Sequence, residues 1–307
     1  MLDKSGDGQT NKRSNSKLKV RQGNPLAMRE KILNESSSFA VNEASKVARS
    51  NLLFLRTEET RQIIAVTSTF EAEGKTTNCI NLSISLAQAG MRTLLIDADL
   101  RRPMTDKMFD ARSVEGLSDY LACLTSAKSA QDIQSLIRPT GHENLSILPA
   151  GHIPPNPVEL LASKRMELML EELSKHYDYI MIDTPPVSVV TDATVLKNHI
   201  NGYLIVIRSG QTQRDALTES VMHMKQIDAN ILGFLLNDVD VKSSYRKYSY
   251  RYRKYGKYYK YGHYSGSRGY DNPYGYGEPD YSSWPQAKPE SQRQKAEDGD
   301  IEPTRLK

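Results

Sequence analysis

The chain has 307 residues, of which 38% are hydrophobic, and a formal net charge of +4 at pH 7. Its two cysteines, Cys79 and Cys123, are too few and too far apart for a disulfide framework or a Cys-x-x-Cys metal site, which favours a reducing cytoplasm. No apolar run approaches the ~18–20 residues of a membrane span, and no hydrophobic stretch follows the charged N-terminus. We therefore expect neither a transmembrane helix nor a signal peptide.

The small net charge conceals regions of different character. Residues 1–240 carry 27 Lys and Arg against 29 Asp and Glu, whereas nine basic residues and no acidic ones lie between Lys242 and Arg268. Both ends of the chain are polar, and such segments cannot offset the entropy lost on folding. We predict a flexible arm over 1–39, a folded domain over 40–240, a separate basic segment over 241–284 and a disordered C-terminus over 285–307.

Within the predicted domain, apolar strands alternate with helices. A helix is expected over 40–55, with apolar residues near one face at Val41, Ala44, Val47, Ala48, Leu52 and Leu55. Strands are expected over 63–67, 93–97, 145–148, 179–183, 203–207 and 231–237, and helices over 75–89, 117–124, 157–176 and 213–227. This alternation predicts an α/β fold, a mostly parallel sheet flanked by helices, in which ligands bind at the carboxyl ends of the strands.

The loop after the first strand has the features of a phosphate site. It ends in Glu73-Gly74-Lys75-Thr76-Thr77, between a strand and a helix, as a P-loop requires. Backbone N–H groups at a helix start favour anionic phosphates, a lysine reaches the β- and γ-phosphates, and the first threonine hydroxyl suits Mg²⁺.

Two positions depart from the standard P-loop pattern. Thr69 stands where the first glycine is usual, and Ala72 replaces a glycine often found two residues before Gly74. An alanine is tolerated at position 72 if its φ is negative, and nucleotide affinity suffers if it is not.

Three aspartates follow predicted strands. Asp97 and Asp99 end one strand at a spacing of two residues, and Asp183 ends another. A lone aspartate at such a place is as often a helix N-cap, but three together with a P-loop indicate ligands for a nucleotide-bound Mg²⁺.

The tyrosines are the most unusual feature of the sequence. Thirteen of the seventeen lie after the last predicted strand, among Arg, Lys, Gly and Ser and without aliphatic residues that could form a core. They are Tyr245, Tyr248, Tyr250, Tyr252, Tyr255, Tyr258, Tyr259, Tyr261, Tyr264, Tyr270, Tyr274, Tyr276 and Tyr281. We call residues 241–284 the tyrosine-rich segment. Its phenols serve either chemistry or binding.

These motifs together resemble a known family. The runs Glu73-Gly74-Lys75-Thr76, Leu95 to Pro103 and Ile182 to Pro186 are similar to the Walker A, A′ and B motifs of the bacterial tyrosine kinases that regulate capsule and exopolysaccharide production. That family has a P-loop fold related to MinD and ParA. The resemblance implies an ATP- and Mg²⁺-dependent protein-tyrosine kinase that autophosphorylates the tyrosine-rich segment.

The resemblance also implies roles for individual residues. Lys75 would neutralise the γ-phosphate, Asp97 would accept the phenol proton, and Thr76, Asp99 and Asp183 would hold Mg²⁺. The spacing of Asp97 and Asp99 does not decide which of the two accepts the proton and which holds Mg²⁺. Asn237 would contact the adenine, and Arg101 and Arg102 are either docking or structural residues.

Assembly and partners follow from the same resemblance. The family's Glu-x-x-Arg-x-x-Arg motif, which joins subunits into a ring, matches Glu43, Lys46 and Arg49, with a lysine in place of the first arginine. The resemblance further implies a separate transmembrane adaptor of polysaccharide export as activator, a phosphotyrosine phosphatase, and a place at the inner face of the cell membrane. The alternatives are a MinD/ParA-like ATPase that controls localisation or assembly, and a nucleic-acid-binding protein that uses the Arg/Tyr-rich tail.

Overall fold

The computed structural model describes residues 29–55, 61–109, 115–125, 127 and 129–239. The tyrosine-rich segment and the predicted disordered C-terminus lie outside these residues. The expected arm over 1–39 falls only partly within them, and its described part differs from that expectation. Ile32 and Leu33 are buried, and the Leu33 N–H donates a 2.8 Å hydrogen bond to Asn81 Oδ1 on the first helix after the P-loop.

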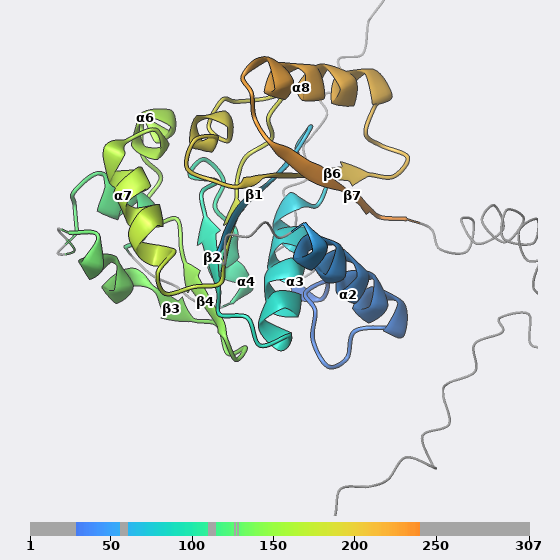
Figure 1. Cartoon of the computed structure of the whole chain (residues 1–307), viewed down its shortest axis with the longest axis horizontal. Coiled ribbons are helices and arrows are strands. Elements are labelled where there is room, and N and C mark those ends of the chain that lie inside the picture. The colour runs from blue at the N-terminus through green and yellow to red at the C-terminus, as the bar shows by residue number, and fades with distance from the viewer. Residues whose placement is uncertain (1–28, 56–60, 110–114, 126, 128, 240–307) are drawn as a thin grey trace, which may run out of the picture. The chain divides into compact units, whose positions relative to one another are not determined.

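The described residues form a single seven-stranded sheet. Its strands are β1 (Gln62–Ser68), β2 (Thr93–Asp97), β3 (Arg138–Pro139), β4 (Leu145–Leu148), β5 (Tyr179–Asp183), β6 (Gly202–Arg208) and β7 (Ile231–Asn237). The spatial order is β3-β4-β2-β5-β1-β6-β7, and every pairing is parallel except that of β3 with β4. The mostly parallel α/β fold expected from the sequence is confirmed, as Figure 1 shows.

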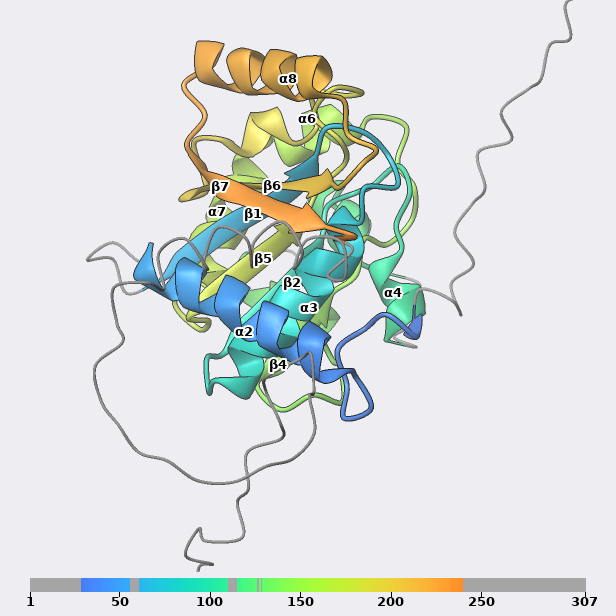
Figure 2. The same ribbon diagram turned by 90° about the vertical axis from the view of Figure 1, so that its right-hand side faces the viewer.

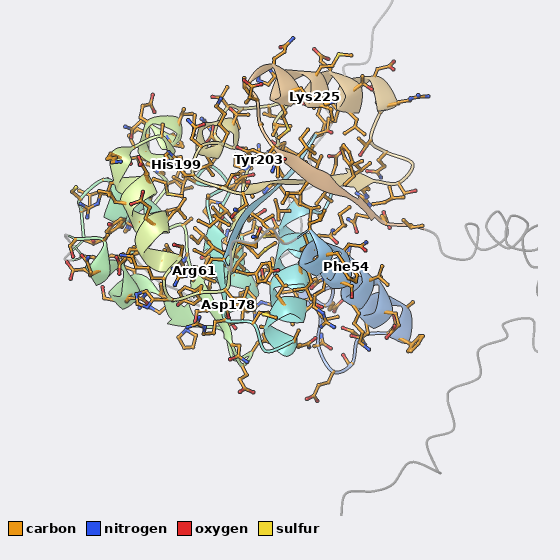
Figure 3. The ribbon with its side chains drawn as sticks, viewed as in Figure 1. Phe54, Arg61, Asp178, His199, Tyr203 and Lys225 are labelled. Atoms are coloured by element: carbon orange, nitrogen blue, oxygen red, sulfur yellow. The ribbon has the colours of Figure 1, made fainter. Side chains whose placement is uncertain are left out.

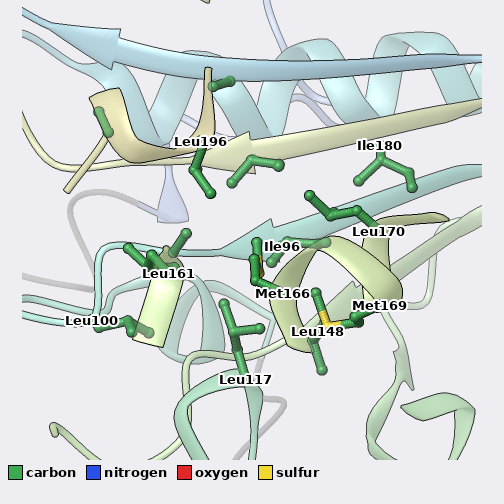
Figure 4. Close-up of a cluster of buried hydrophobic side chains, with 14 of the residues drawn as sticks. Ile96, Leu100, Leu117, Leu148, Leu161, Met166, Met169, Leu170, Ile180 and Leu196 are labelled. Atoms are coloured by element: carbon green, nitrogen blue, oxygen red, sulfur yellow. The ribbon is translucent and has the colours of Figure 1, made fainter. Parts of the chain in front are cut away.

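Helices cover both faces of the sheet. On one face lie α2 (Phe39–Phe54) and α3 (Lys75–Gln88), in the foreground of Figure 2, with the four-residue α4 (Thr105–Met108) nearby. On the other lie α5 (Leu117–Leu121), α6 (Pro157–Leu161), α7 (Lys164–Leu173) and α8 (Arg214–Gln226), with two short 3-10 turns over Gln131–Leu136 and Thr194–Leu196. Figure 4 shows the second face, where Leu170 of α7 lies near Ile180 and Met166 lies near Ile96.

Strand residues alternate between these two cores. Ile180 and Ile182 of β5 point into the core under α7, whereas Tyr179 and Met181 point into the core under α3. Because both faces are buried, the strands read as unbroken apolar runs in the sequence.

Two predicted helices are shorter than expected. The helix expected over 157–176 is divided into α6 and α7, because Ser163 leaves the helical path and caps α7, its side chain accepting from the Met166 N–H. The helix expected over 117–124 ends at Leu121, since Cys123 adopts a positive φ of 60°.

The helix α2 differs most from its prediction. Much of its apolar stripe is exposed, namely Val41, Val47 and Leu55, and so are Phe39 and Phe54 at its ends. Within α2, Leu52 alone is buried. The helix therefore rests on α3 through a narrow contact. Among the described residues, no helix is long and apolar enough to cross a membrane.

Candidate nucleotide site

The site lies at the carboxyl end of the sheet, where β1, β2, β5 and β7 end. The amino ends of the strands are opposite, marked in Figure 3 by Arg61 before β1 and Asp178 before β5. The loop between β1 and α3 is the predicted P-loop, and the helix starts at Lys75 as expected.

Gly74 is required by geometry. Its φ is +93°, a conformation that L side chains rarely adopt, and a Cβ there would lie 2.1 Å from Asn237 Nδ2. The helix α3 thus starts directly after a position whose conformation and close contacts favour glycine. The N–H groups of the first turn of a helix have no partner within the helix and can bind an anion there.

Ala72 has a φ of 63°, so the condition under which an alanine is harmless is not met. A left-handed conformation costs an alanine roughly 1–2 kcal/mol relative to glycine. Its carbonyl oxygen accepts a 3.2 Å hydrogen bond from the Arg208 guanidinium, which helps to hold the loop in this conformation.

Side chains from β6, β7 and the loop after β6 brace the P-loop. Glu73 is buried, and its carboxylate accepts from the Phe70 N–H at 3.0 Å and from the Thr212 hydroxyl. Asn237 donates from Nδ2 to the Glu73 carbonyl oxygen at 2.9 Å. The amide nitrogen of Asn237, expected at the adenine, therefore contacts the P-loop itself.

The three predicted aspartates do converge on the P-loop. Asp97 lies directly opposite Asp183 in the β2–β5 pairing. The ammonium of Lys75 lies 2.8 Å from Asp99 Oδ2 and 3.4 Å from Asp183 Oδ1, and the Thr76 hydroxyl donates to Asp183 Oδ2 at 2.7 Å. Strand ends far apart in the sequence thus bring one cation and three carboxylates together.

Burial and mutual charge shift the pKa values of this group. Burial would lower the pKa of Lys75, but the carboxylates of Asp183 and Asp99 outweigh it and raise that pKa above its ordinary value. Burial raises the pKa of Asp183, opposed by Lys75. For Asp97, burial and then the charge of Asp183 raise the pKa to about 7. A carboxylate that titrates near neutrality is suited to proton transfer.

Asp97 is held by a residue that the sequence analysis did not identify. Its Oδ2 accepts from the Met104 N–H at 3.1 Å, from the Thr105 N–H at 3.0 Å and from the Thr105 hydroxyl at 2.8 Å. Its Oδ1 accepts from the Asp99 N–H at 3.2 Å. Thr105 is the first residue of the short helix α4. Its place shortly after Asp97 and Asp99 is the one signal in the sequence that could have identified it.

The two arginines of the A′ motif have different partners. Arg101 makes two hydrogen bonds, of 2.8 and 3.0 Å, to the fully buried carboxylate of Asp192, which also escaped the sequence analysis. Arg102 instead forms an exposed ion pair with Glu71 of the P-loop. The first arginine therefore holds the loop to the interior, and the second lies at its surface.

The remaining predicted residues lie on α3 and α2. Thr77 is half-buried in the first turn of α3. Glu43 and Lys46 form an exposed ion pair of 2.8 Å, but Arg49 turns away from them and donates to the Ser85 carbonyl oxygen on α3 at 2.9 Å. The three residues thus do not form one continuous charged row.

Known proteins resemble this chain in sequence and in fold. The family model described as an AAA domain matches residues 61–246. The tyrosine-protein kinase CpsD of Streptococcus agalactiae is 37% identical over 193 residues, which cover 62% of this chain and 80% of CpsD. The tyrosine-protein kinase YwqD of Bacillus subtilis is 33% identical over 230 residues, covering 75% of this chain and 91% of YwqD.

A solved structure agrees with these sequence matches. The kinase domain of the Escherichia coli tyrosine kinase ETK superposes with a TM-score of 0.60 at 33% identity, over 64% of this chain and 75% of that one. The match to the whole etk protein covers 28% of its length, so etk carries a long further part that this match does not include.

Proposed function

The chain belongs to the bacterial tyrosine-protein kinases, and from that premise we propose that it transfers the γ-phosphoryl group of ATP to the tyrosines of its own tyrosine-rich segment. The family is one of ATP-binding P-loop enzymes, and the enzyme class is protein-tyrosine kinase. The observation that carries the proposal is the contact of Lys75 with Asp99 and Asp183 beside Thr76.

The residues present are suited to Mg²⁺. Among the described residues no three His, Cys, Asp or Glu side chains form a metal site by themselves. However, Mg²⁺ bound with a nucleotide needs one or two carboxylates, a hydroxyl and phosphate oxygens. Thr76 and Asp183, whose oxygens lie 2.7 Å apart, together with Asp99 supply these hard oxygen ligands. When bound, the ion would neutralise charge on the transferring phosphoryl group.

The protein residues divide the remaining work. Lys75 exchanges its carboxylate partners for the β- and γ-phosphates, and the N–H groups of Gly74, Lys75 and Thr76 at the start of α3 hold the phosphate oxygens. A phenol has a pKa near ~10, so it is a weak nucleophile at neutral pH. Asp97 takes up the phenol proton as the phenol oxygen bonds to the γ-phosphorus and the bond from that phosphorus to the β–γ bridging oxygen breaks, releasing ADP. Thr105 orients the Asp97 carboxylate.

A labelling experiment with the full-length chain tests this proposal. We expect phosphotyrosine when the protein is incubated with ATP and Mg²⁺, and its loss both in Lys75→Met and in a variant with the thirteen segment tyrosines replaced by Phe. The Phe variant should still bind ATP. Mixing it with Lys75→Met should label the Lys75→Met chain, since transfer occurs between molecules. Labelling of Lys75→Met alone at the parental rate would disprove the proposal.

We further propose that the protein acts in capsular or exopolysaccharide synthesis, from the cytoplasmic face of the membrane. Its activator would be the cytoplasmic end of a separate transmembrane adaptor, and a phosphotyrosine phosphatase would reverse the reaction. Glu43, Lys46 and Arg49 would contribute to a ring in which each segment meets a neighbouring site. Adding the adaptor's cytoplasmic peptide should raise the labelling rate, and an unchanged rate with every such peptide would argue against an adaptor.

A further inference from the structure

The ion pair between Glu71 and Arg102 occupies a particular place. Inside the site, Lys75 of the P-loop pairs with Asp99 of the A′ loop, and these side chains are 12% and 8% exposed. At the surface, Glu71 and Arg102 join the same two loops, and their side chains are 38% and 65% exposed. The Arg102 N–H also donates to Asp99 Oδ1 at 3.1 Å, so the outer pair is fixed directly to the inner one.

This outer pair can exchange partners at little cost. Exposed ion pairs contribute roughly 0–1 kcal/mol, and Arg102 has neither burial nor a second carboxylate partner among the contacts described for it. Arg101 differs, because its guanidinium is committed to the buried Asp192. A second cation brought to the site could therefore replace Arg102 at Glu71.

The tyrosine-rich segment presents such cations unevenly. The eight tyrosines from Tyr245 to Tyr261 each have an arginine or lysine as an immediate neighbour. The five from Tyr264 to Tyr281 have none, and Tyr270 and Tyr281 are instead adjacent to an aspartate. The sequence thus divides the acceptors into a basic group and a non-basic group.

We propose that Glu71 is a specificity-determining residue that selects acceptor tyrosines with an adjacent arginine or lysine, and that Arg102 competes with the acceptor for it. This inference rests on the proposed function. It predicts that the tyrosines from Tyr245 to Tyr261 are phosphorylated before those from Tyr264 to Tyr281. Glu71 then favours acceptors with an adjacent arginine or lysine, whereas Arg102 opposes their binding.

The test compares two peptides as substrates of the full-length Phe-substituted kinase. One covers residues 249–256, Ser-Tyr-Arg-Tyr-Arg-Lys-Tyr-Gly, and the other has its three basic residues replaced by Gln. For the parent we expect kcat/KM to be about two- to fivefold higher with the basic peptide, the range that one exposed ion pair supplies. The difference should lie in KM and shrink at high salt.

Two matched variants separate selection from simple bracing of the loops. Glu71→Gln should abolish the preference, whereas Arg102→Gln should increase it, with activity on the neutral peptide as the internal reference in each. If the pair only braces the loops, both substitutions will change activity in the same direction and leave the peptide ratio as it was. That result would overturn the inference.

Failure of the inference is distinguishable from failure of the proposed function. A parent enzyme that phosphorylates both peptides equally refutes selection by Glu71 and leaves the kinase intact. If the Phe-substituted kinase phosphorylates neither peptide and the unsubstituted chain does not phosphorylate its own segment, the proposed function is refuted. In the intact chain, a time course of phosphotyrosine mapping should show the basic group first, and the same order in Glu71→Gln would also contradict the inference.

Discussion

Replacing Asp97 by Asn should stabilise the protein while removing its kinase activity. Asp97 is fully buried and opposite Asp183, and its pKa is raised to about 7 by burial and by that neighbouring charge. In the unfolded chain the pKa of an aspartate is ~3.9. Between these values the folded state binds a proton that the unfolded state does not, so stability falls as pH rises from ~4 to ~7.

The magnitude follows from the size of the shift. A difference of roughly 3 pKa units corresponds to roughly 4 kcal/mol lost by pH 7 and above. Asn carries no charge and escapes this loss, but it has a single acceptor oxygen. If the Asn oxygen accepts from Thr105, as Asp97 Oδ2 does, the Asn NH₂ group faces the Asp99 N–H, which in the parent donates to Asp97 Oδ1 at 3.2 Å. Two donors then face each other, at a cost of roughly 1–2 kcal/mol. The net gain is roughly 2 kcal/mol at pH 8, or about 4–8 °C in Tm.

Denaturant unfolding of both proteins at pH 5, 6, 7 and 8, without nucleotide or Mg²⁺, measures this gain. It should be small or negative at the lowest pH and grow until pH ~7. Asp192→Asn is the matched control, because it removes a buried aspartate that is paired with Arg101 and should therefore destabilise the protein. A gain for Asp97→Asn that did not change with pH, or a loss at pH 8, would refute the reasoning.

Four further predictions concern nucleotide binding and activity. In Ala72→Gly, relief of the positive φ should tighten ATP binding by severalfold and raise stability by up to about 1 kcal/mol, measured by nucleotide titration and unfolding. Gly74→Ala should lose ATP binding in the same titration, since its Cβ would collide with Asn237. Thr105→Val should lower kcat about tenfold with little change in the KM for ATP, and Thr105→Ser should restore it. With Asp97 as base, kcat/KM for ATP should fall about tenfold per pH unit below pH ~7, in a pH–rate profile.

Each of these has a contrary outcome. Unchanged ATP affinity in Ala72→Gly would mean that the left-handed residue does not hinder nucleotide binding. Tight binding by Gly74→Ala would contradict the close approach of Asn237. Equal activity of the Val and Ser variants at position 105 would remove the hydroxyl from the orientation of Asp97. A profile flat between pH 5 and 8 would exclude Asp97 as the base.

The strands and the meeting of the motifs could be predicted from the sequence, because both depend on local patterns. Four strands, β2, β4, β5 and β7, begin and end where the apolar runs do. In a parallel sheet the carboxyl ends share one edge, so Asp97, Asp183 and the P-loop were expected at the same edge. Helix ends were less predictable, since Ser163 reads as an ordinary helical residue until its side chain is seen to cap α7.

The supporting contacts could not be predicted, because they join residues distant in sequence. Nothing near Asp192 indicates that it accepts the guanidinium of Arg101, 91 residues away. The contact of Thr212 with Glu73 spans 139 residues, and that of Asn237 with the Glu73 carbonyl spans 164. Such pairs depend on which strands become neighbours, and a single sequence does not state that order.

These contacts explain how the P-loop tolerates an alanine at position 72. A glycine-rich loop adopts its shape because its own backbone permits it, whereas here Ala72 is held at a positive φ with its carbonyl bonded to Arg208. Arg208 in turn pairs with Asp238, directly after Asn237 at the end of β7. The phosphate loop therefore takes part of its shape from the strand that precedes the tyrosine-rich segment. A displacement of the end of β7 would therefore reach the P-loop by two routes, through the bond from Asn237 to the Glu73 carbonyl and through the pairing of Asp238 with Arg208.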